Sequence, residues 1–316
     1  MNLFYFNINK ICNNSCSFCA AEIDNNENIM HKKSNISFFK FKKIFETLTF
    51  KKGDKIIING GEPTLNSDLV KILTFCNSVC ARIILFTNGR KLSDMSYAEQ
   101  IIKRNIEKIS IPLHGHNALL HDRITRKQNS FTETTLALNN ISFLKKSYKF
   151  YIELKILICE DNYSHIKNIA ELFFNNFKFD TLLLSGLIPS KIAQKNKQIV
   201  SKEKHMLSVN KFLDGYFLSN NKLPDLLIDG IPMCHLNDKN RLFYLFYRMK
   251  KKFPENETQD NIFLIDTDLD GSITISDIKN TWNDAVCYKT DCKYLTVCRL
   301  NTLIYSKEFL KGWINE

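Results

Sequence analysis

Three cysteines near the N-terminus have the spacing that points most directly to chemistry in this chain. Cys12, Cys16 and Cys19 form a C-x3-C-x2-C triplet directly behind a short apolar run over residues 3–8. Thiolates this close in sequence can share one metal centre. An iron–sulfur cubane usually takes four cysteines, so a loop that supplies three leaves one iron open to an outside ligand. A zinc-binding knuckle and cysteines that are merely buried are the alternatives.

A second motif follows the next β-prone run of the chain. Residues 55–59 read Lys-Ile-Ile-Ile-Asn, and residues 60–63 read Gly-Gly-Glu-Pro. The cysteine triplet and the GGEP sequence together resemble the radical S-adenosylmethionine (SAM) superfamily, which carries these motifs after its first and second barrel strands. Both motifs occur here in that order.

The resemblance implies a cofactor and the residues that bind it. Cys12, Cys16 and Cys19 would bind a [4Fe–4S] cluster, and its open iron would chelate the amino and carboxylate groups of SAM. Phe18, the aromatic residue before the third cysteine, would pack near the adenine of SAM. The second motif would hold the methionine amino group of SAM, and it consists of Gly60, Gly61, Glu62 and Pro63.

Length and composition describe a globular protein with room for a large core. The chain has 316 residues, of which 44% are hydrophobic, enough for one big domain and a smaller one. Its longest apolar stretches, such as residues 181–189, are too short to span a bilayer, and no basic region precedes an apolar one at the N-terminus. Ten cysteines at metal-ligand spacings without an export signal indicate metal sites in a reducing compartment, so we expect a cytoplasmic protein.

The net charge of +11 is compatible with an acidic partner. The lysines, however, are spread along the whole chain, and no dense basic block with interleaved aromatic residues occurs. This distribution argues against nucleic-acid binding.

Runs rich in Ile, Leu and Phe alternate with longer stretches of helical period up to about residue 220. Strands are predicted over residues 3–8, 55–59, 82–87, 108–113, 150–159 and 181–187, and helices over residues 37–50, 68–80, 97–105, 131–146, 163–177 and 202–220. This order predicts an α/β protein with a parallel sheet and right-handed crossovers. The resemblance implies its form, a partial (β/α)6 TIM-like barrel over residues 1–222 with the chemistry at the carboxyl ends of the strands.

Alternation within the strands predicts which side chains face the inside of the barrel. Glu153, Lys155 and Cys159 alternate with apolar neighbours in the fifth strand, and Ser110 and His114 do so around the fourth. If helices cover the apolar face, these five residues look into the barrel. The alternative for each polar residue is a hydrogen-bonded group that binds no ligand.

Some of these residues are candidates for roles in SAM chemistry. In related enzymes the fourth strand and the loop after it contact the ribose and carboxylate of SAM, so the resemblance favours Ser110, with Asn88 nearby and Lys155 further round. Cys159 is a candidate for returning a hydrogen atom to a substrate radical, and a small residue that fills the barrel mouth is the alternative. Residues 121–126 resemble a His-Asp segment of peptide-modifying members, but Thr125 stands where sulfatase-maturing members have an arginine that helps to hold SAM.

The alternation ends after Asn221, and four further cysteines fall in the tail. Residues 291–299 resemble the C-x-Y-L-x-x-C text of SPASM and twitch auxiliary domains, although two cysteines of the SPASM pattern are absent. The resemblance implies a small α+β domain over residues 223–316 with one auxiliary iron–sulfur cluster of the [4Fe–4S] type. A tetrahedral zinc is the alternative, and both would use Cys234, Cys287, Cys292 and Cys298.

Residues 266–277 match a calcium-binding EF-hand loop except for Asp277 at the twelfth position. An EF-hand needs a helix before the loop, but Pro254 and the polar residues after it break any helix there. Residues 262–265 and 273–275, joined by a turn with Asp270-Gly271, instead predict a β-hairpin.

The resemblance implies an enzyme that reductively cleaves SAM to a 5′-deoxyadenosyl radical and abstracts a hydrogen atom from its substrate. An auxiliary domain on a barrel of this size is typical of maturases that modify a ribosomally made peptide or a protein. Their modifications are cross-links, thioethers, epimerisation and side-chain oxidation. The peptide leader would then be read elsewhere or by a separate protein, because no recognition domain fits before Cys12, and a protein such as flavodoxin or ferredoxin would donate electrons. The alternatives are a radical SAM enzyme for a small molecule and a non-catalytic relative that binds an iron–sulfur cluster or zinc.

Overall fold

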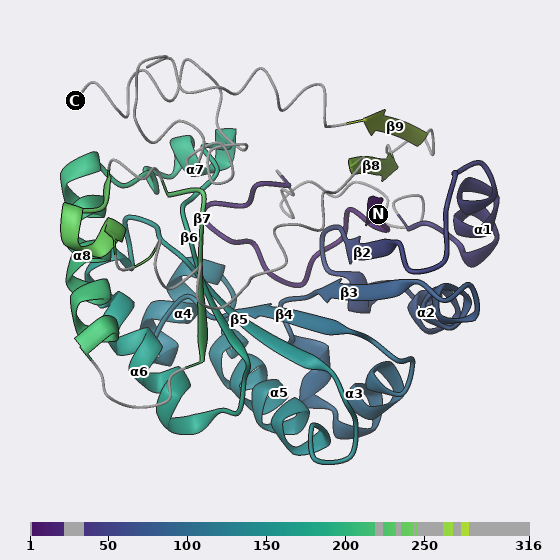
Figure 1. The fold of residues 1–316 in the computed structure, drawn as a ribbon, viewed down its shortest axis with the longest axis horizontal. Helices are drawn as coiled ribbons and strands as arrows, with labels where there is room; N and C mark the ends of the chain where they lie inside the picture. The colour runs from purple at the N-terminus through teal and green to yellow at the C-terminus, as the bar shows by residue number, and fades with distance from the viewer. Residues whose placement is uncertain are drawn as a thin grey trace.

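The computed structural model describes residues 2–21, 35–218, 224–231, 235–242, 244, 262–267 and 273–277. The predicted auxiliary ligands Cys234, Cys287, Cys292 and Cys298 lie outside the described residues. Within the described part, a curved sheet forms the inside of the molecule and helices cover its outer side (Figure 1).

The sheet contains nine strands in the order β7-β6-β5-β4-β3-β2-β1-β8-β9. Neighbouring strands are parallel except for β8 and β9. The strands are β1 (Leu3–Asn7), β2 (Lys55–Asn59), β3 (Arg82–Phe86), β4 (Lys108–Pro112), β5 (Tyr151–Leu157), β6 (Thr181–Ser185), β7 (Asp225–Asp229), β8 (Ile262–Thr267) and β9 (Ile273–Asp277). The predicted α/β fold with a parallel, TIM-like sheet is confirmed, and the six predicted strands are present, β2 with the predicted bounds and the other five slightly shorter.

The helices follow the strands as predicted, with two additions. They are α1 (Phe38–Glu46), α2 (Leu69–Ser78), α3 (Met95–Ile102), α4 (Ala118–Thr125), α5 (Ser130–Leu144), α6 (Ile166–Asn176), α7 (Lys191–Lys195) and α8 (Lys202–Leu218). The two additional helices are α4 and α7, which are short and were not predicted from the sequence. A signal for α4 was present in Asn117, whose side chain caps the helix by accepting a hydrogen bond from Leu120 N at 2.9 Å. No described helix is long and apolar enough to cross a membrane.

Strand β7 corrects the expectation that the alternation ends at Asn221. It pairs in parallel with β6, beginning with Thr181 opposite Asp225. Its period-2 signal is weak because only three apolar residues stand between two aspartates, and Pro224 and Gly230 flank the strand. Described residues beyond position 222 therefore extend the barrel sheet. The position at which an auxiliary domain begins stays a prediction.

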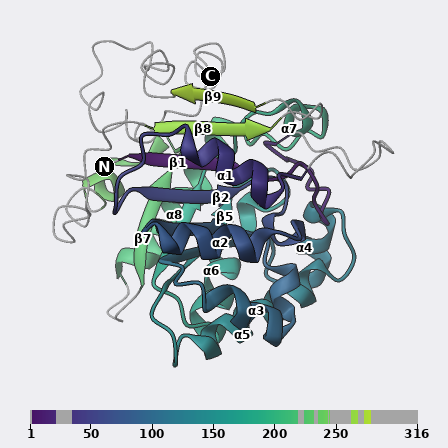
Figure 2. The ribbon, with the colours of Figure 1, turned by 90° about the vertical axis from the view of Figure 1, so that its right-hand side faces the viewer.

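The antiparallel pair β8–β9 confirms the predicted hairpin. Asp266 and Thr267 lie opposite Thr274 and Ile273, so both ends of the segment that resembles a calcium loop are paired strands. An EF-hand loop would be entered from a helix, whereas this one is entered from a strand. The hairpin lies along β1, with which β8 pairs in parallel, at the edge of the barrel (Figure 2).

Alternation along the strands separates the main core from the inside of the barrel. On the outer face, side chains such as Phe4, Phe6 and Ile58 are fully buried against the helices. On the inner face, Leu3, Ile57 and Ile84 form a small separate cluster. Burying a side chain of this size stabilises the fold by roughly 1.5–3 kcal/mol. The inside of the barrel is thus partly filled by apolar groups, and space remains at the carboxyl ends of the strands.

Candidate active site

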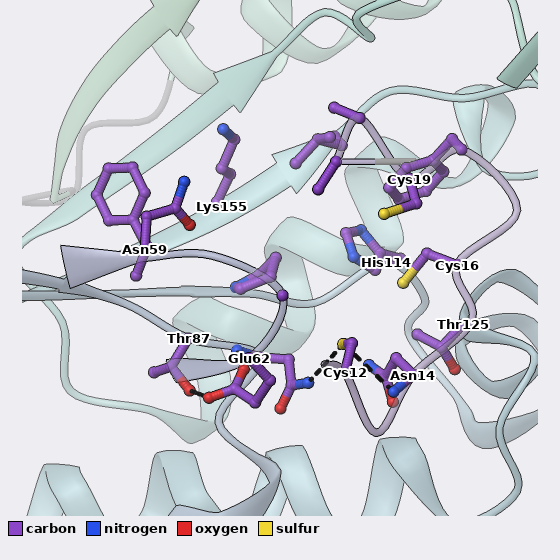
Figure 3. A pocket seen from close by; sticks show the side chains of 18 of the residues that line it. Cys12, Asn14, Cys16, Cys19, Asn59, Glu62, Thr87, His114, Thr125 and Lys155 are labelled. Atoms are coloured by element: carbon purple, nitrogen blue, oxygen red, sulfur yellow. Dashed lines mark hydrogen bonds between the residues drawn. The ribbon is translucent and has the colours of Figure 1, made fainter. Parts of the chain in front are cut away.

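A cavity of about 270 Å³ lies at the carboxyl ends of the strands (Figure 3). Both sequence motifs and the inward-facing strand residues line it, as the spacing predicted. The predicted residues that line it are Cys12, Cys16, Phe18, Cys19, Gly60, Gly61, Glu62, Asn88, Ser110 and Lys155. Pro63 and Cys159 are not among the lining residues.

The cysteine loop rests on the carboxyl end of α4. Ser15 N donates to Thr125 O at 2.9 Å, and Ser17 N donates to Ile124 O at 2.8 Å. From another side, Asn196 Nδ2 donates to Ser17 O at 2.9 Å. These bonds fix the backbone on both sides of the second cysteine, so the missed helix α4 is the support of the loop.

The three thiols of the loop are partly buried and open to the cavity. Burial raises the pKa of Cys12 to about 12, and it also raises the pKa of Cys16. Two groups point donors at the Cys12 sulfur, Asn14 N at 3.4 Å and Asn88 Nδ2 at 3.8 Å. Thiols of this kind lose their protons readily only to a nearby cation, such as an iron centre.

The three cysteines fit an iron–sulfur cluster better than a single ion. No group of three or more ligating side chains among the described residues converges on one point. A [4Fe–4S] cluster takes one thiolate at each iron corner, so its ligands surround the cluster instead of meeting at a point. The three sulfurs at one end of the cavity suit this geometry.

The glycine motif is bonded to the segment that leads into the cysteine loop. Gly61 N donates to Asn9 O at 2.8 Å, Glu62 N donates to Ile11 O at 2.7 Å, and Asn9 Nδ2 donates to Glu62 O at 2.7 Å. Gly60 has a φ of 139°, and a Cβ atom there would lie 2.5 Å from Asn9 O. Only glycine allows this close approach of the two segments.

The Glu62 carboxylate is turned into the protein and is almost completely buried. Its Oε1 accepts hydrogen bonds from Thr64 N at 3.0 Å, Thr64 Oγ1 at 2.6 Å and Thr87 Oγ1 at 2.6 Å. Its Oε2 accepts one from Asn88 N at 2.7 Å. Burial raises the pKa of Glu62, while these bonds oppose the rise. Glu62 therefore joins the ends of β2 and β3, and Pro63 after it opens a short 3-10 turn, Pro63–Leu65.

The opposite wall of the cavity carries charged and polar groups from β4 and β5. Ser110 Oγ donates to Glu153 Oε1 at 2.8 Å, and Lys108 Nζ lies 2.7 Å from Glu153 Oε2. Lys155 lines the cavity, and its ammonium group makes no hydrogen bond or ion pair with any described residue. Burial lowers the pKa of Lys155, and the negative charges of Asp229 and Glu153 oppose this. The inward orientation predicted for Ser110, Glu153 and Lys155 is confirmed.

Cys159 lies two residues beyond the end of β5 and does not line the cavity. Its side chain is fully buried in an apolar cluster with Phe18, Leu120 and Ile124. Alternation gave the correct face of the strand, but the cysteine loop and α4 pack over this position. The arrangement favours the alternative, a small residue that fills space at the barrel mouth.

The structure shows contacts of His114 and Arg90 at the site that the sequence did not reveal. The His114 side chain lines the cavity, packs edge-to-face on Phe18 with ring centroids 4.9 Å apart, and leaves Nδ1 without a hydrogen-bond partner among the described residues. Burial lowers the pKa of His114 well below its usual value, so the ring is neutral. Arg90, which no motif marks, bonds to the cysteine loop. The arginines at positions 123 and 126 do not line the cavity.

The cysteine loop and the glycine motif meet at the mouth of a parallel barrel. This combination defines a class of proteins that depend on an iron–sulfur cluster. Residues 6–173, more than half of the chain, match the family model of the radical SAM superfamily. The chain belongs to this superfamily, which implies a [4Fe–4S] cluster and SAM.

Among curated proteins, the chain is similar to an AdoMet-dependent heme synthase of Oleidesulfovibrio alaskensis, with 24% identity over 213 residues. The match covers 67% of this chain and 52% of that protein, so the chain spans about half the length of this relative.

Two solved structures show the same fold. SuiB of Streptococcus suis bound to its precursor peptide SuiA has a TM-score of 0.62 at 12% identity, covering 98% of this chain and 75% of SuiB. The protein anSMEcpe with bound AdoMet and the Kp18Cys peptide has a TM-score of 0.56 at 16% identity, covering 71% of this chain and 63% of that protein. At these identities the likeness concerns the fold alone.

Proposed function

We propose that this protein is a radical SAM enzyme that reductively cleaves SAM and modifies a peptide or protein substrate. The observation that carries the proposal is the joining of the two motifs: the segment before Cys12 is hydrogen-bonded to Gly61 and Glu62 at the mouth of one cavity. This arrangement places three thiols and the exposed backbone of a glycine motif around the same space.

In this proposal each part of the cavity has a task. Cys12, Cys16 and Cys19 hold the [4Fe–4S] cluster, which supplies the electron that splits SAM into methionine and a 5′-deoxyadenosyl radical. Gly60 and Gly61 offer backbone groups to the amino group of SAM. Phe18, Asn88, Ser110 and Lys155 line the remaining space, where they would orient SAM and exclude water.

A peptide substrate is supported by the fold neighbours SuiB and anSMEcpe, whose structures contain a bound peptide. The auxiliary cluster on Cys234, Cys287, Cys292 and Cys298 and an electron donor such as flavodoxin or ferredoxin complete this proposal. A small-molecule substrate is the second candidate. It is favoured by the modest cavity, in which the ammonium group of Lys155 bonds to no described residue, and by the similarity to a heme synthase.

Iron content and SAM cleavage test the central claim. Anaerobically reconstituted protein should hold about eight irons if both clusters form, and the Cys12→Ala/Cys16→Ala/Cys19→Ala variant should lose about half of them. With dithionite and SAM, the wild type should release 5′-deoxyadenosine and the triple variant should not. The exposed Cys80 provides a matched control, because Cys80→Ser should keep both properties. A fully loaded and reduced wild type that leaves SAM intact would contradict the proposal.

The substrate class needs a separate experiment. The protein should be co-expressed with any short peptide encoded beside its gene, and the peptide should be examined by mass spectrometry for a loss of hydrogens, a cross-link or deuterium uptake from solvent. A changed peptide mass with the wild type but not with the triple cysteine variant supports the peptide. Turnover of a small molecule with an unchanged peptide supports the second candidate.

A further inference from the structure

Arg90 is a buried cation that sits behind the cysteine loop and outside both sequence motifs. Its side chain is only 8% exposed, and its Nε lies 2.5 Å from Glu133 Oε2 on α5. Gly89, with a φ of 82°, lets the chain turn sharply after β3 and brings Arg90 back toward the loop. A guanidinium in this position needs partners for its remaining donors, because an unpaired buried charge is costly.

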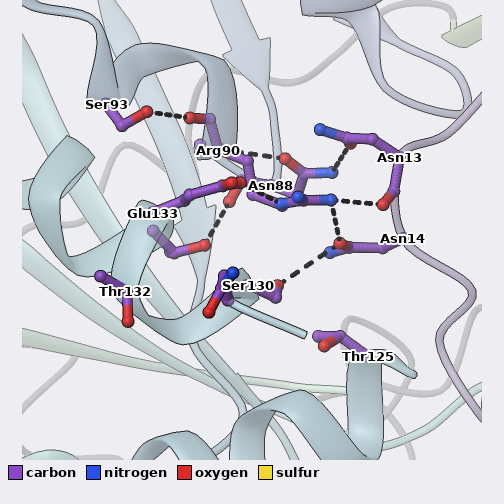
Figure 4. Close-up of polar contacts among 12 residues, drawn as sticks. Asn13, Asn14, Asn88, Arg90, Ser93, Thr125, Ser130, Thr132 and Glu133 are labelled. Carbon is purple, nitrogen blue, oxygen red and sulfur yellow. Dashed lines mark hydrogen bonds and ion pairs between the residues drawn. The ribbon is translucent and has the colours of Figure 1, made fainter. Parts of the chain in front are cut away.

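Those partners are two consecutive residues of the cysteine loop (Figure 4). Arg90 Nη1 donates to the backbone oxygen of Asn13 and, at 3.1 Å, to Asn14 Oδ1. Both residues lie in the three-residue spacer between Cys12 and Cys16. The planar guanidinium holds Glu133 through Nε and the two loop acceptors through Nη1 at the same time, which the single nitrogen of a lysine cannot do in the same geometry.

The same spacer determines the surroundings of the Cys12 sulfur. Asn14 N points at Cys12 Sγ from 3.4 Å. Asn88, whose Oδ1 accepts a bond from Arg90 N at 3.0 Å, donates from Nδ2 to Asn13 Oδ1 at 2.7 Å and to Cys12 Sγ at 3.8 Å. The Arg90 side chain is therefore linked to both of these N–H donors, to Asn14 directly and to Asn88 through Asn13, whereas the direct bond to Asn88 comes from the Arg90 backbone.

We propose that Arg90 is a positioning residue that holds the N–H donors of Asn14 and Asn88 on the Cys12 sulfur and thereby raises the reduction potential of the cluster. The inference rests on the proposed ligation of the cluster by Cys12. Hydrogen bonds to ligand sulfurs stabilise the reduced, more negative state of a cluster, and partners outside the ligand set tune it in this way. Glu133 balances the charge of Arg90, so its effect on Cys12 comes from fixed geometry.

The test measures the cluster potential by an electron paramagnetic resonance titration with graded reductant, with and without SAM. Arg90→Met should lower the one-electron equilibrium constant for reduction about tenfold, which corresponds to a shift of about 59 mV to more negative values. Arg90→Lys should give a smaller shift, because the ammonium keeps the pairing with Glu133 but loses the fork. The double variant Arg90→Met/Asn14→Ala should shift no further than Arg90→Met, because both act through the same bonds.

Arg82→Met is the matched control. Arg82 makes a comparable ion pair, 2.6 Å from Nε to Glu107 Oε2, at the opposite end of β3, so its loss should leave the potential unchanged. A wild-type potential in Arg90→Met at full iron content would overturn the inference. If Arg90→Met fails to take up iron, Arg90→Lys and Asn14→Ala decide, and wild-type potentials in both would overturn it.

Failure of the underlying assignment gives a different result. If the triple cysteine variant keeps the signal of the SAM-binding cluster, Cys12 is not a ligand, and the proposed site falls together with this inference. A normal triple-variant result with an unshifted Arg90→Met potential removes only the role of Arg90.

Discussion

The close approach of Gly60 to Asn9 allows a quantitative test of how the two motifs are joined. A Cβ atom at position 60 would lie 2.5 Å from Asn9 O, 2.8 Å from Asn9 Oδ1 and 3.0 Å from Asn9 N. Two of these atoms belong to the backbone, and Asn9 O is also held by Gly61 N at 2.8 Å. The neighbour therefore cannot turn away as a flexible side chain would.

Gly53 provides the control for Gly60→Ala. It also has a positive φ, 88°, but a Cβ there would meet nothing within 4 Å. Gly53→Ala should therefore show only the cost of the left-handed backbone, about 1–2 kcal/mol. Gly60→Ala adds the overlap with Asn9, and overpacking of this kind costs about 1–3 kcal/mol, so we expect a total loss of roughly 2–5 kcal/mol.

Urea unfolding of the cluster-free, reduced proteins, followed by circular dichroism, measures both free energies. Iron uptake and SAM binding are then measured on whatever folded Gly60→Ala protein remains, and both should fall, whereas Gly53→Ala should keep both. If the two variants lose the same stability to within about 0.5 kcal/mol, the approach of the two segments is not tight, and the argument for their joining fails.

Three further outcomes are expected. Burial lowers the pKa of His121 to about 4 from its usual 6.5, so the unfolded chain binds more protons between these pH values and the free energy of unfolding falls as the pH drops from 6.5 to 4. His121→Gln should reduce this loss by roughly 2 kcal/mol between pH 7 and 4.5, measured by urea unfolding. An unchanged dependence of the unfolding free energy on pH would contradict this prediction. Lys155→Met should stabilise the cluster-free protein by about 1 kcal/mol at pH 7, because it removes a buried cation whose ammonium group bonds to no described residue. It should also weaken SAM binding measured by calorimetry, and lower stability with unchanged binding would oppose both statements. In the folded protein, iodoacetamide should modify the exposed Cys80 and spare the buried Cys76, as read by peptide mass spectrometry, and equal modification would mean that α2 opens.

The sequence predicted the barrel well because its strands carry strong local signals. Strand β2, with three consecutive isoleucines between polar ends, is bounded as predicted at Lys55–Asn59. Strand β7 and helix α7 were missed for the opposite reason, since each has five residues and little periodicity of its own. Their presence depends on pairing and packing with elements that the local sequence does not reveal.

Site prediction succeeded where chemistry requires fixed residue types at fixed spacing. The cysteine triplet and the glycine motif were found in this way, and they line one cavity. Asn9 and Arg90 carry no such spacing, because their roles arise from hydrogen bonds to residues far away in sequence. Cys159 was selected by alternation, but alternation predicts only the side on which a residue lies and not the segments that pack over it.

Hydrogen bonds that involve the residues missed by the sequence prediction connect the loops after β1, β2 and β3 to one another. Asn9, after β1, bonds to Glu62 after β2, and the Glu62 carboxylate bonds to Thr87 and Asn88 after β3. Arg90, also after β3, bonds back to the cysteine loop after β1. The three connections form a closed ring, in which any two still link all three loops when the third is lost. A variant that removes one connection should therefore lower the free energy of unfolding by less than the sum of its lost bonds suggests. A variant that removes two connections should lower it by more than the two single variants together.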